Sequence, residues 1–404
     1  MSNPIYFFFA INYFAQGMSG LVYEPISYLL KDGLKLSAAQ SSTFIWWMTL
    51  PFLIKPVFGL LSDYLPIRGF RRKPHIAIVA GSAALAWAAL AFRPGAGYYG
   101  LLALLVLVNV GVAASDVICD GVMVEQGKAE GKTGLFQAVQ IGTLYAALVI
   151  TGLGGGWLAA HVSMRKNFAL AAIFPAMIAL SSFWTRESGE KKRSLPGGGE
   201  LLGLLRDRKF WAISAFIFLW SFYPFLGTAE FYYQSDVLKL SPVFIGLLDT
   251  LGGFAGVAGA AFYGRVIGRR FKTADLIKGA VLVYGPLSLL FLLYLGPVSV
   301  AIVTVVLGVA GVAFRLALMD LAAQSCPKGA EATAFAAYMS VFNLAASASN
   351  AAGGHLYEVF KRIFSAQANP AYLAIAALTF VGTTCTFSCW WLLPAVLRND
   401  AAGA

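Results

Sequence analysis

The chain has 404 residues, of which 59% are hydrophobic and 12% are charged. Because about a quarter of the residues of a soluble globular protein are charged, this composition excludes a soluble protein and indicates an integral membrane protein. The formal net charge is +11, but the basic residues lie mostly in short loops between apolar runs. They therefore indicate topology in a lipid bilayer, and nucleic acid is not expected as a partner.

Apolar segments long enough to cross a bilayer, which takes about 20 residues per helix, follow one another along the whole chain. In chain order they are 6–30, 39–61, 74–92, 98–125, 133–160, 167–184, 210–234, 242–264, 274–295, 298–325, 332–357 and 371–396. We therefore predict an all-α polytopic membrane protein with twelve transmembrane helices.

The loops between these segments alternate in their content of Lys and Arg. Nineteen basic residues lie in one set of loops and eight in the alternate set. Because basic loops are retained in the cytoplasm, both termini are predicted to be cytoplasmic. The first segment begins without a basic leader or a cleavage site, and the sequence has no Asn-X-Ser/Thr acceptor site. We therefore expect a multi-pass protein of a bacterial cell (inner) membrane.

The longest hydrophilic segment, residues 185–209, separates the first six predicted helices from the last six. The tetrapeptide LKLS occurs at 34–37 and again, 204 residues later, at 238–241. A second set of matches, at an offset of 200, pairs Asp120 with Asp320, Lys128 with Lys328, Thr133 with Thr333 and Gly154 with Gly354. We predict an N-terminal six-helix bundle (1–184), a cytoplasmic linker (185–209) and a C-terminal six-helix bundle (210–404), related as parallel repeats.

The stretch FLIKPVFGLLSDYLPIRGFRRKP, residues 52–74, joins the second and third predicted helices. It resembles the G-x-L-x-D-x-x-G-R-K signature loop of the major facilitator superfamily, although the segment between the acid and the second glycine is longer. The resemblance implies a conformational latch, in which an acid at a helix end pairs with basic residues or a helix N-terminus and is released as the carrier changes state. A loop that is basic only for topological reasons is the alternative. The predicted latch residues are Gly59, Asp63, Gly69, Arg71, Arg72 and Lys73.

Three longer stretches, GLVYEPISYLLKDGLKLS, IKPVFGLLSDYLPIRGFRRKP and DVICDGVMVE, together look like the folate–biopterin transporter family within that superfamily. The resemblance covers most of the first half and is vaguer in the second. It implies a secondary active transporter, a symporter that takes up pteridines such as folates or biopterin with protons, by alternating access between the two bundles.

Ionisable residues also occur inside the predicted helices, where each costs about 2.5–3.5 kcal/mol unless it faces a cavity or a partner. The predicted substrate- and proton-binding residues are Glu24, Lys55, Asp116, Asp120, Glu230, Arg315 and Asp320. Asp249 lies in the segment 242–264. In the superfamily that the chain resembles, the first, fourth, seventh and tenth helices line the central path.

The spacing of Asp116 and Asp120 places both carboxyl groups on one face of a helix. Two acids one turn apart should not both be ionised, so one of them can take up a proton in a coupled carrier. The alternative is that Asp116 pairs with Arg315 and only holds the two halves together. Lys55 and Arg315 are the residues expected to receive an anionic small-molecule substrate, because a basic side chain binds the carboxylate of a folate.

The sequence contains no cysteine or histidine pattern of a metal site, no nucleophile–base pair and no phosphate-binding loop, so we expect neither a metal, nor a cofactor, nor an enzyme. Two functions remain as alternatives to pteridine uptake. One is a carrier of another organic anion or a drug-type exporter. The other is a protein that keeps the fold and binds a pigment or a sensor partner without transporting anything.

Overall fold

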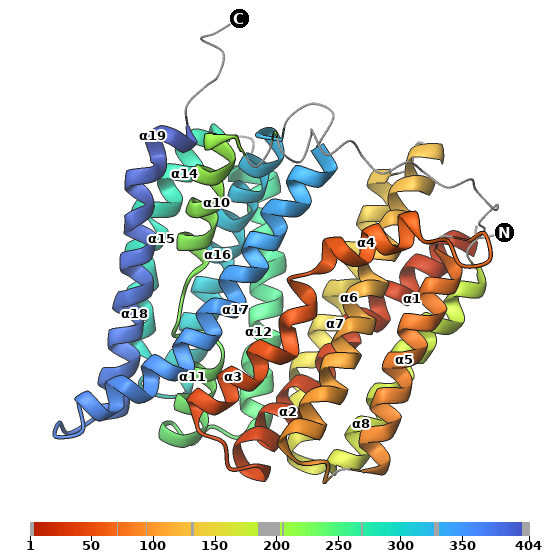
Figure 1. Cartoon of the computed structure of the whole chain (residues 1–404). Helices are drawn as coiled ribbons and strands as arrows, with labels where there is room; N and C mark the ends of the chain where they lie inside the picture. The colour runs from red at the N-terminus through yellow and green to blue at the C-terminus, as the bar shows by residue number, and fades with distance from the viewer. Residues whose placement is uncertain are drawn as a thin grey trace, which may run out of the picture. The chain divides into compact units, whose positions relative to one another are not determined.

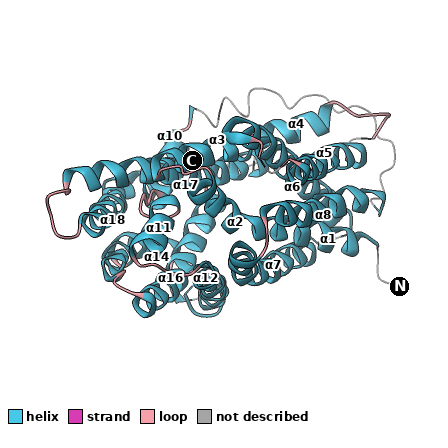
Figure 2. Cartoon of the chain, turned by 90° about the horizontal axis from the view of Figure 1, so that it is seen from below, coloured by secondary structure: helices cyan, strands magenta, loops and turns pink. Residues whose placement is uncertain are grey.

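In the computed structural model the described residues are 4–397, except 71, 94, 131–132, 185–202, 204–205, 268–269 and 327–330. Within these ranges the chain is almost entirely helical, and its only β structure is an isolated bridge between Ile67 and Phe70. Figure 2 shows the helices joined by short loops. Each of the twelve segments predicted to cross the membrane coincides with helix.

The elements of the first half alternate between long helices and short turns (Figure 1). They are α1 (Pro4–Met18), a 3₁₀ turn (Ser19–Val22), α2 (Tyr23–Tyr28), a π-helical turn (Leu29–Gly33), α3 (Ala38–Thr49), a 3₁₀ turn (Leu50–Phe52), α4 (Lys55–Tyr64), α5 (Lys73–Phe92), α6 (Gly97–Glu130), α7 (Thr133–His161), α8 (Met164–Ser181) and a 3₁₀ turn (Ser182–Trp184).

The second half also alternates between long helices and short turns. Its elements are α10 (Arg208–Ser221), α11 (Thr228–Tyr232), a π-helical turn (Tyr233–Val237), α12 (Pro242–Phe262), a π-helical turn (Tyr263–Ile267), α14 (Thr273–Leu282), α15 (Tyr284–Leu287), a 3₁₀ helix (Ser288–Leu293), α16 (Pro297–Gln324), α17 (Glu331–Ile363), α18 (Pro370–Ser388), a 3₁₀ turn (Cys389–Leu392) and α19 (Leu393–Val396).

Eight helical segments of the described chain are long and apolar enough, by length and composition, to cross a membrane. They are Ala38–Ser62, Lys73–Phe92, Gly97–Met123, Met164–Trp184, Pro242–Ile267, Thr273–Leu293, Pro297–Gln324 and Pro370–Val396.

The helices form two compact units, and neither is a continuous stretch of the chain. The first unit contains Met1–Leu36, Trp47–Leu195 and Ser241–Thr250, and the second contains Ser37–Trp46, Pro196–Leu240 and Leu251–Ala404. The first unit therefore includes the beginning of α12, and the second unit includes the beginning of α3. The remainder of each of these two helices belongs to the other unit. The predicted division of the chain at 185–209 falls largely outside the described residues and stays a prediction.

Each unit has its own apolar core. In the first unit, Phe8, Phe9 and Tyr13 of α1 pack with Ile118 of α6 and Phe174 of α8, among other buried residues. Because lipid tails are as apolar as these side chains, the packing is held together by close van der Waals contact and not by exclusion of water.

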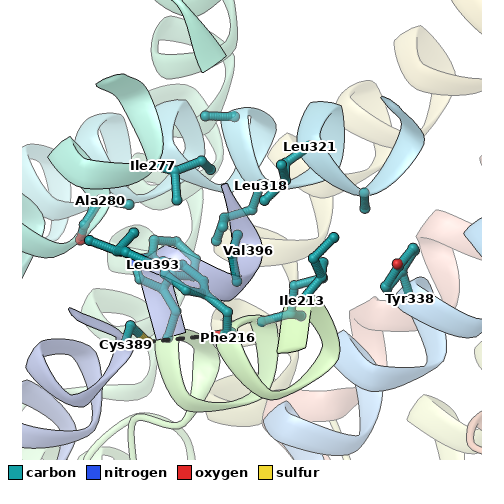
Figure 3. Packing of buried hydrophobic residues seen from close by; sticks show 14 of the residues in the cluster. Ile213, Phe216, Ile277, Ala280, Leu318, Leu321, Tyr338, Cys389, Leu393 and Val396 are labelled. Carbon is teal, nitrogen blue, oxygen red and sulfur yellow. Dashed lines mark hydrogen bonds between the residues drawn. The ribbon is translucent and has the colours of Figure 1, made fainter. Parts of the chain in front are cut away.

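Figure 3 shows the core of the second unit, where α10, α14, α16, α17 and α19 meet. Ile213 and Phe216 of α10 lie under Val396 and Leu393, and the thiol of Cys389 donates to the carbonyl oxygen of Phe216 at 3.6 Å. This cysteine is a small packing residue in the core.

The LKLS repeat has a structural counterpart. The π-helical turns Leu29–Gly33 and Tyr233–Val237 each precede one copy, 204 residues apart. The lysines within the two copies, Lys35 and Lys239, have φ angles of 55° and 54°, in the left-handed region that is uncommon for a residue with a side chain. The two copies therefore form the same turn.

Three predicted helices are interrupted, one of them (274–295) only at Val283, between α14 and α15. The segment 39–61 ends as α3 at Thr49, and α4 begins at Lys55, because Pro51 and Pro56 lack the N–H group that a continuous helix requires. This break makes Lys55 the first residue of a helix.

The segment 210–234 is also interrupted, between Ser221 and Thr228. The N–H group and the hydroxyl of Thr228 both donate to Oδ1 of Asn350 on α17, at 2.7 and 2.9 Å. Inside a membrane, irregular backbone needs such partners. The break contains Pro224, which lacks an N–H group, and Gly227, whose φ of 93° favours glycine. The prediction of one helix over 210–234 follows the apolar run and passes over these two residues.

Candidate functional site

The ion pair between Lys55 and Asp116 joins α4 to α6 inside the first unit. Nζ of Lys55 lies 2.7 Å from Oδ2 of Asp116, and the side chains are 27% and 23% exposed. The ammonium group also lies 5.3 Å from the ring centre of Phe52. The pair is therefore only partly buried, and Asp116 balances the charge of Lys55.

Asp120 lies one turn after Asp116 on α6 and has a different partner. The hydroxyl of Tyr13 on α1 donates to Oδ1 of Asp120 at 2.7 Å. The predicted shared helix face is therefore present, but its two acids interact with different helices. Asp116 is held by α4 and Asp120 by α1.

The predicted latch residues lie around the end of α4 and the start of α5. Gly69 has φ +83° and closes the turn between Ile67 and Phe70, a conformation that favours glycine. Gly59 of α4 lies against Val117 of α6. Arg71 and the side chain of Asp63 lie outside the described residues.

Arg72 connects this loop to α6. Its side chain is buried, and its Nη1 donates to Oγ of Ser62 on α4 at 2.6 Å. The guanidinium lies against Gly121, where a Cβ atom added to the glycine would stand 2.9 Å from Cζ of Arg72. Lys73 begins α5, and its ammonium group lies 5.3 Å from the ring of Phe183.

The predicted acids of the second unit also accept hydrogen bonds. Oδ2 of Asp320 accepts from Thr273 at 3.1 Å and from Gln324 at 2.8 Å. Oε1 of Glu230 accepts from Gln234 at 3.0 Å and from the hydroxyl of Tyr294 at 2.9 Å.

Arg315, the other residue expected to receive an anion, also belongs to the second unit. Its guanidinium lies 5.3 Å from the ring centre of Phe342.

Two acids, Glu24 and Asp249, differ from Asp116, Asp120, Asp320 and Glu230. Oε1 of Glu24, on α2, is buried without a hydrogen-bond partner among the described residues. Asp249, on α12, interacts electrostatically with Glu24, and both lie in the first unit. Asp249 and Tyr13 were not among the predicted site residues. Nothing in the sequence indicates that Tyr13, 107 positions before Asp120, is its donor.

Comparisons with known proteins agree with the fold and with the resemblance. Residues 16–400 match the profile of the BT1 family. A folate-biopterin transporter of Synechocystis sp. is 30% identical over 350 residues, which cover 82% of this chain and 70% of that protein. Folate transporter 2 of Plasmodium falciparum is 26% identical over 357 residues, covering 82% and 75%.

Solved structures share the fold at low sequence identity. The nucleoside transporter NupG has a TM-score of 0.72 at 12% identity, covering 97% of this chain and 99% of that one. A D-xylose–proton symporter has a TM-score of 0.70 at 12% identity, covering 97% and 98%. The predictions of a major facilitator fold and of a membrane transporter rather than an enzyme are confirmed.

Proposed function

The chain belongs to the BT1 family of membrane transporters, and from this premise we propose that it carries folate- or biopterin-type pteridines by proton-coupled symport. Transport follows alternating access, in which the binding site opens to one side of the membrane at a time. The names of the relatives support the substrate class.

The observation that carries the proposal is the partly exposed ion pair of Lys55 and Asp116. A cation at membrane depth is costly without a counter-ion, so Asp116 neutralises Lys55 while the site is empty. A substrate carboxylate forms the same contact with the ammonium group and takes the place of Asp116. The ammonium group therefore favours anions over neutral pteridines, and Asp116 stands without its counter-ion while the substrate is bound.

The other predicted residues have supporting roles in this proposal. Arg315 provides a second basic group for the anion, and Asp320 and Glu230 complete the polar residues on the second unit. The proton binds to one of the intramembrane acids Glu24, Asp116 and Asp120.

The latch residues hold the loop between α4 and α5 against α6 in one state of the cycle. The contact of Arg72 with Ser62 and Gly121 supports this role. The positively charged loops support cytoplasmic termini and a bacterial inner membrane.

The test is uptake of labelled folate by proteoliposomes that contain the purified chain, with and without an inward proton gradient. Lys55→Gln should abolish uptake, and Lys55→Arg should retain part of it because the positive charge is kept. Lys166→Gln is the matched control, since Lys166 is exposed just before the apolar part of α8, and it should transport normally.

Three results of this experiment decide between proton-coupled pteridine uptake and its alternatives. Gradient-driven uptake that is lost in Lys55→Gln supports the proposal. Uptake that ignores the gradient removes proton coupling but leaves the substrate class. Wild-type protein that takes up no folate, but takes up another organic anion, contradicts the pteridine assignment.

A further inference from the structure

Asp116 depends on a single partner. In the part of the chain that the structure describes, this partner is the ammonium group of Lys55, 2.7 Å from Oδ2. Asp120, one turn further along α6, accepts a hydrogen bond from the hydroxyl of Tyr13 at 2.7 Å instead. A ligand that takes Lys55 away from Asp116 therefore leaves that carboxylate alone, and it does not disturb the bond between Tyr13 and Asp120.

No other basic side chain among the described residues is paired with Asp116. The helices packed against α6 are α1, α4, α5, α7 and α8. Arg72, just before α5, contacts Ser62 and Gly121. The remaining acidic, basic and thiol groups of these helices lie near a helix end or on α6 itself, and they are Asp63, Lys73, His75, Cys119, Glu125, Lys128, Glu130, His161, Arg165 and Lys166.

The charge of Lys55 balances one carboxylate and not two. In the empty site the charges of Lys55 and Asp116 cancel. A substrate carboxylate that binds the ammonium group adds a negative charge, and an uncompensated charge is costly at membrane depth. A proton on Asp116 cancels it. A pteridine without a carboxylate leaves the ion pair intact, so its binding gives Asp116 no reason to take up a proton.

We propose that Asp116 binds the coupling proton, and that it does so when a substrate carboxylate has taken Lys55. The inference rests on the proposed function and deepens it by selecting one of the three candidate acids and by dividing the substrates into two classes. Pteridines with a carboxylate, such as folate, move together with a proton. Pteridines without a carboxylate, such as biopterin, move without one.

The proton comes from the aqueous phase that delivers the substrate. It forms an O–H bond on the carboxyl group of Asp116, so the site binds one anion and one proton together. When the substrate leaves on the other side, Lys55 pairs with Asp116 again and the O–H bond breaks. The proton is then released to the same side as the substrate.

Glu24 and Asp120 fit this role less well. Neither acid is in contact with Lys55 in the part of the chain that the structure describes. The arrival of an anion at the lysine therefore leaves their surroundings unchanged. Only at Asp116 does substrate binding remove the group that stabilises the charged carboxylate.

The first arm of the test needs no substrate, because Lys55→Gln takes the ammonium group away from Asp116 as the substrate does. Infrared spectroscopy of the full-length protein in lipid follows the carbonyl stretch of a protonated carboxyl group as the pH is lowered. Lys55→Gln should gain a band at a pH at which the wild type lacks it. Lys166→Gln is the matched control, since Lys166 is exposed at the start of α8, and it should resemble the wild type.

Two double variants assign this band. Adding Asp116→Asn to Lys55→Gln should remove it, because the amide cannot bind the proton. Adding Asp120→Asn to Lys55→Gln should leave it in place. Both double variants lack the same lysine, so a difference between them comes from the acid.

The second arm compares accumulation of labelled folate and of labelled biopterin in proteoliposomes. An inward gradient of about one pH unit supports about tenfold accumulation for each proton moved. Folate should accumulate to this extent in the wild type and in Lys166→Gln, whereas biopterin should reach only equal concentrations inside and outside. Asp116→Asn should exchange internal for external folate without accumulating it.

The two arms separate this inference from the proposed function. Wild-type protein that takes up no folate contradicts the proposed function, and the infrared arm still decides whether Asp116 binds a proton once Lys55 is removed. A band that is missing in Lys55→Gln, or that persists after Asp116→Asn is added, overturns the inference. Biopterin that accumulates with the proton gradient as folate does also overturns it.

Discussion

Nζ of Lys55 lies 2.7 Å from Oδ2 of Asp116, although the residues are 61 positions apart in the chain. Lys55 owes this position to the break between α3 and α4, which starts a new helix at the lysine. The pair links an interrupted helix to a continuous one, and both residues come from segments whose sequence is otherwise apolar.

Removing one member of this pair should destabilise the protein. Asp116→Leu leaves Lys55 without its counter-ion and is expected to lower the free energy of unfolding by about 1–3 kcal/mol, less than for a fully buried pair because both side chains are partly exposed. The double variant Lys55→Met, Asp116→Leu should recover most of the loss without recovering transport. Thermal unfolding in detergent measures both effects. A double variant no more stable than Asp116→Leu alone contradicts the prediction.

Tyr13→Phe should destabilise the protein without altering its packing, because the phenylalanine keeps the buried ring and loses the hydroxyl that donates to Asp120 at 2.7 Å and contacts the sulfur of Met123 at 3.6 Å. A hydrogen bond to a charged group contributes about 1.5–3 kcal/mol. Tyr338→Phe is the control, since Tyr338 is equally buried and no hydrogen bond of its hydroxyl is found among the described residues. Equal melting temperatures for the two variants are the outcome that rules the prediction out.

Gly121→Ala should displace the guanidinium of Arg72, because the new Cβ atom meets Cζ and both terminal nitrogens at 2.9–3.0 Å. We expect slower transport and a lower melting temperature. Gly81→Ala on α5 meets no atom within 4 Å, and it should be neutral or stabilising by up to about 1 kcal/mol, since alanine favours helix over glycine. If both variants transport like the wild type, the contact of Arg72 with α6 has no part in the cycle.

Asn350→Ala should destabilise the break between α10 and α11, because the N–H group and the hydroxyl of Thr228 lose their common acceptor. The expected cost is about 1–3 kcal/mol for each group left unsatisfied. Asn350→Asp, which keeps the acceptor oxygen, serves as the matched variant and should retain more stability than Asn350→Ala. The melting temperatures of the two variants check this order, and the reverse order contradicts it.

The sequence predicts the helices well because a run of about 20 apolar residues has few alternatives in a membrane. The LKLS tetrapeptide is recognisable in the sequence as a repeat, and the structure adds that its two copies adopt the same conformation at Lys35 and Lys239. Pro224 and Gly227 mark the interruption before Thr228 in the sequence. Its stabilising partner Asn350 is not predictable in this way, because it is 122 positions away.

The candidate site is predictable in its residues but not in its pairing. Asp116 and Asp120 are recognisable as intramembrane acids, and their spacing places them on one helix face. Their partners cannot be recognised from the sequence, since Lys55 and Tyr13 come from separate helices whose packing depends on the whole fold. Glu24 and Asp249 stand out only when the partners of all the acids are compared.

The discontinuous composition of the two units has a consequence for biosynthesis. Ser37–Trp46 belongs to the second unit but is synthesised with the first half of the chain, and Ser241–Thr250 belongs to the first unit but is synthesised with the second half. A gene cut between the halves therefore yields two fragments that each lack a piece of their own fold. Neither unit is therefore complete until both halves of the chain have been synthesised.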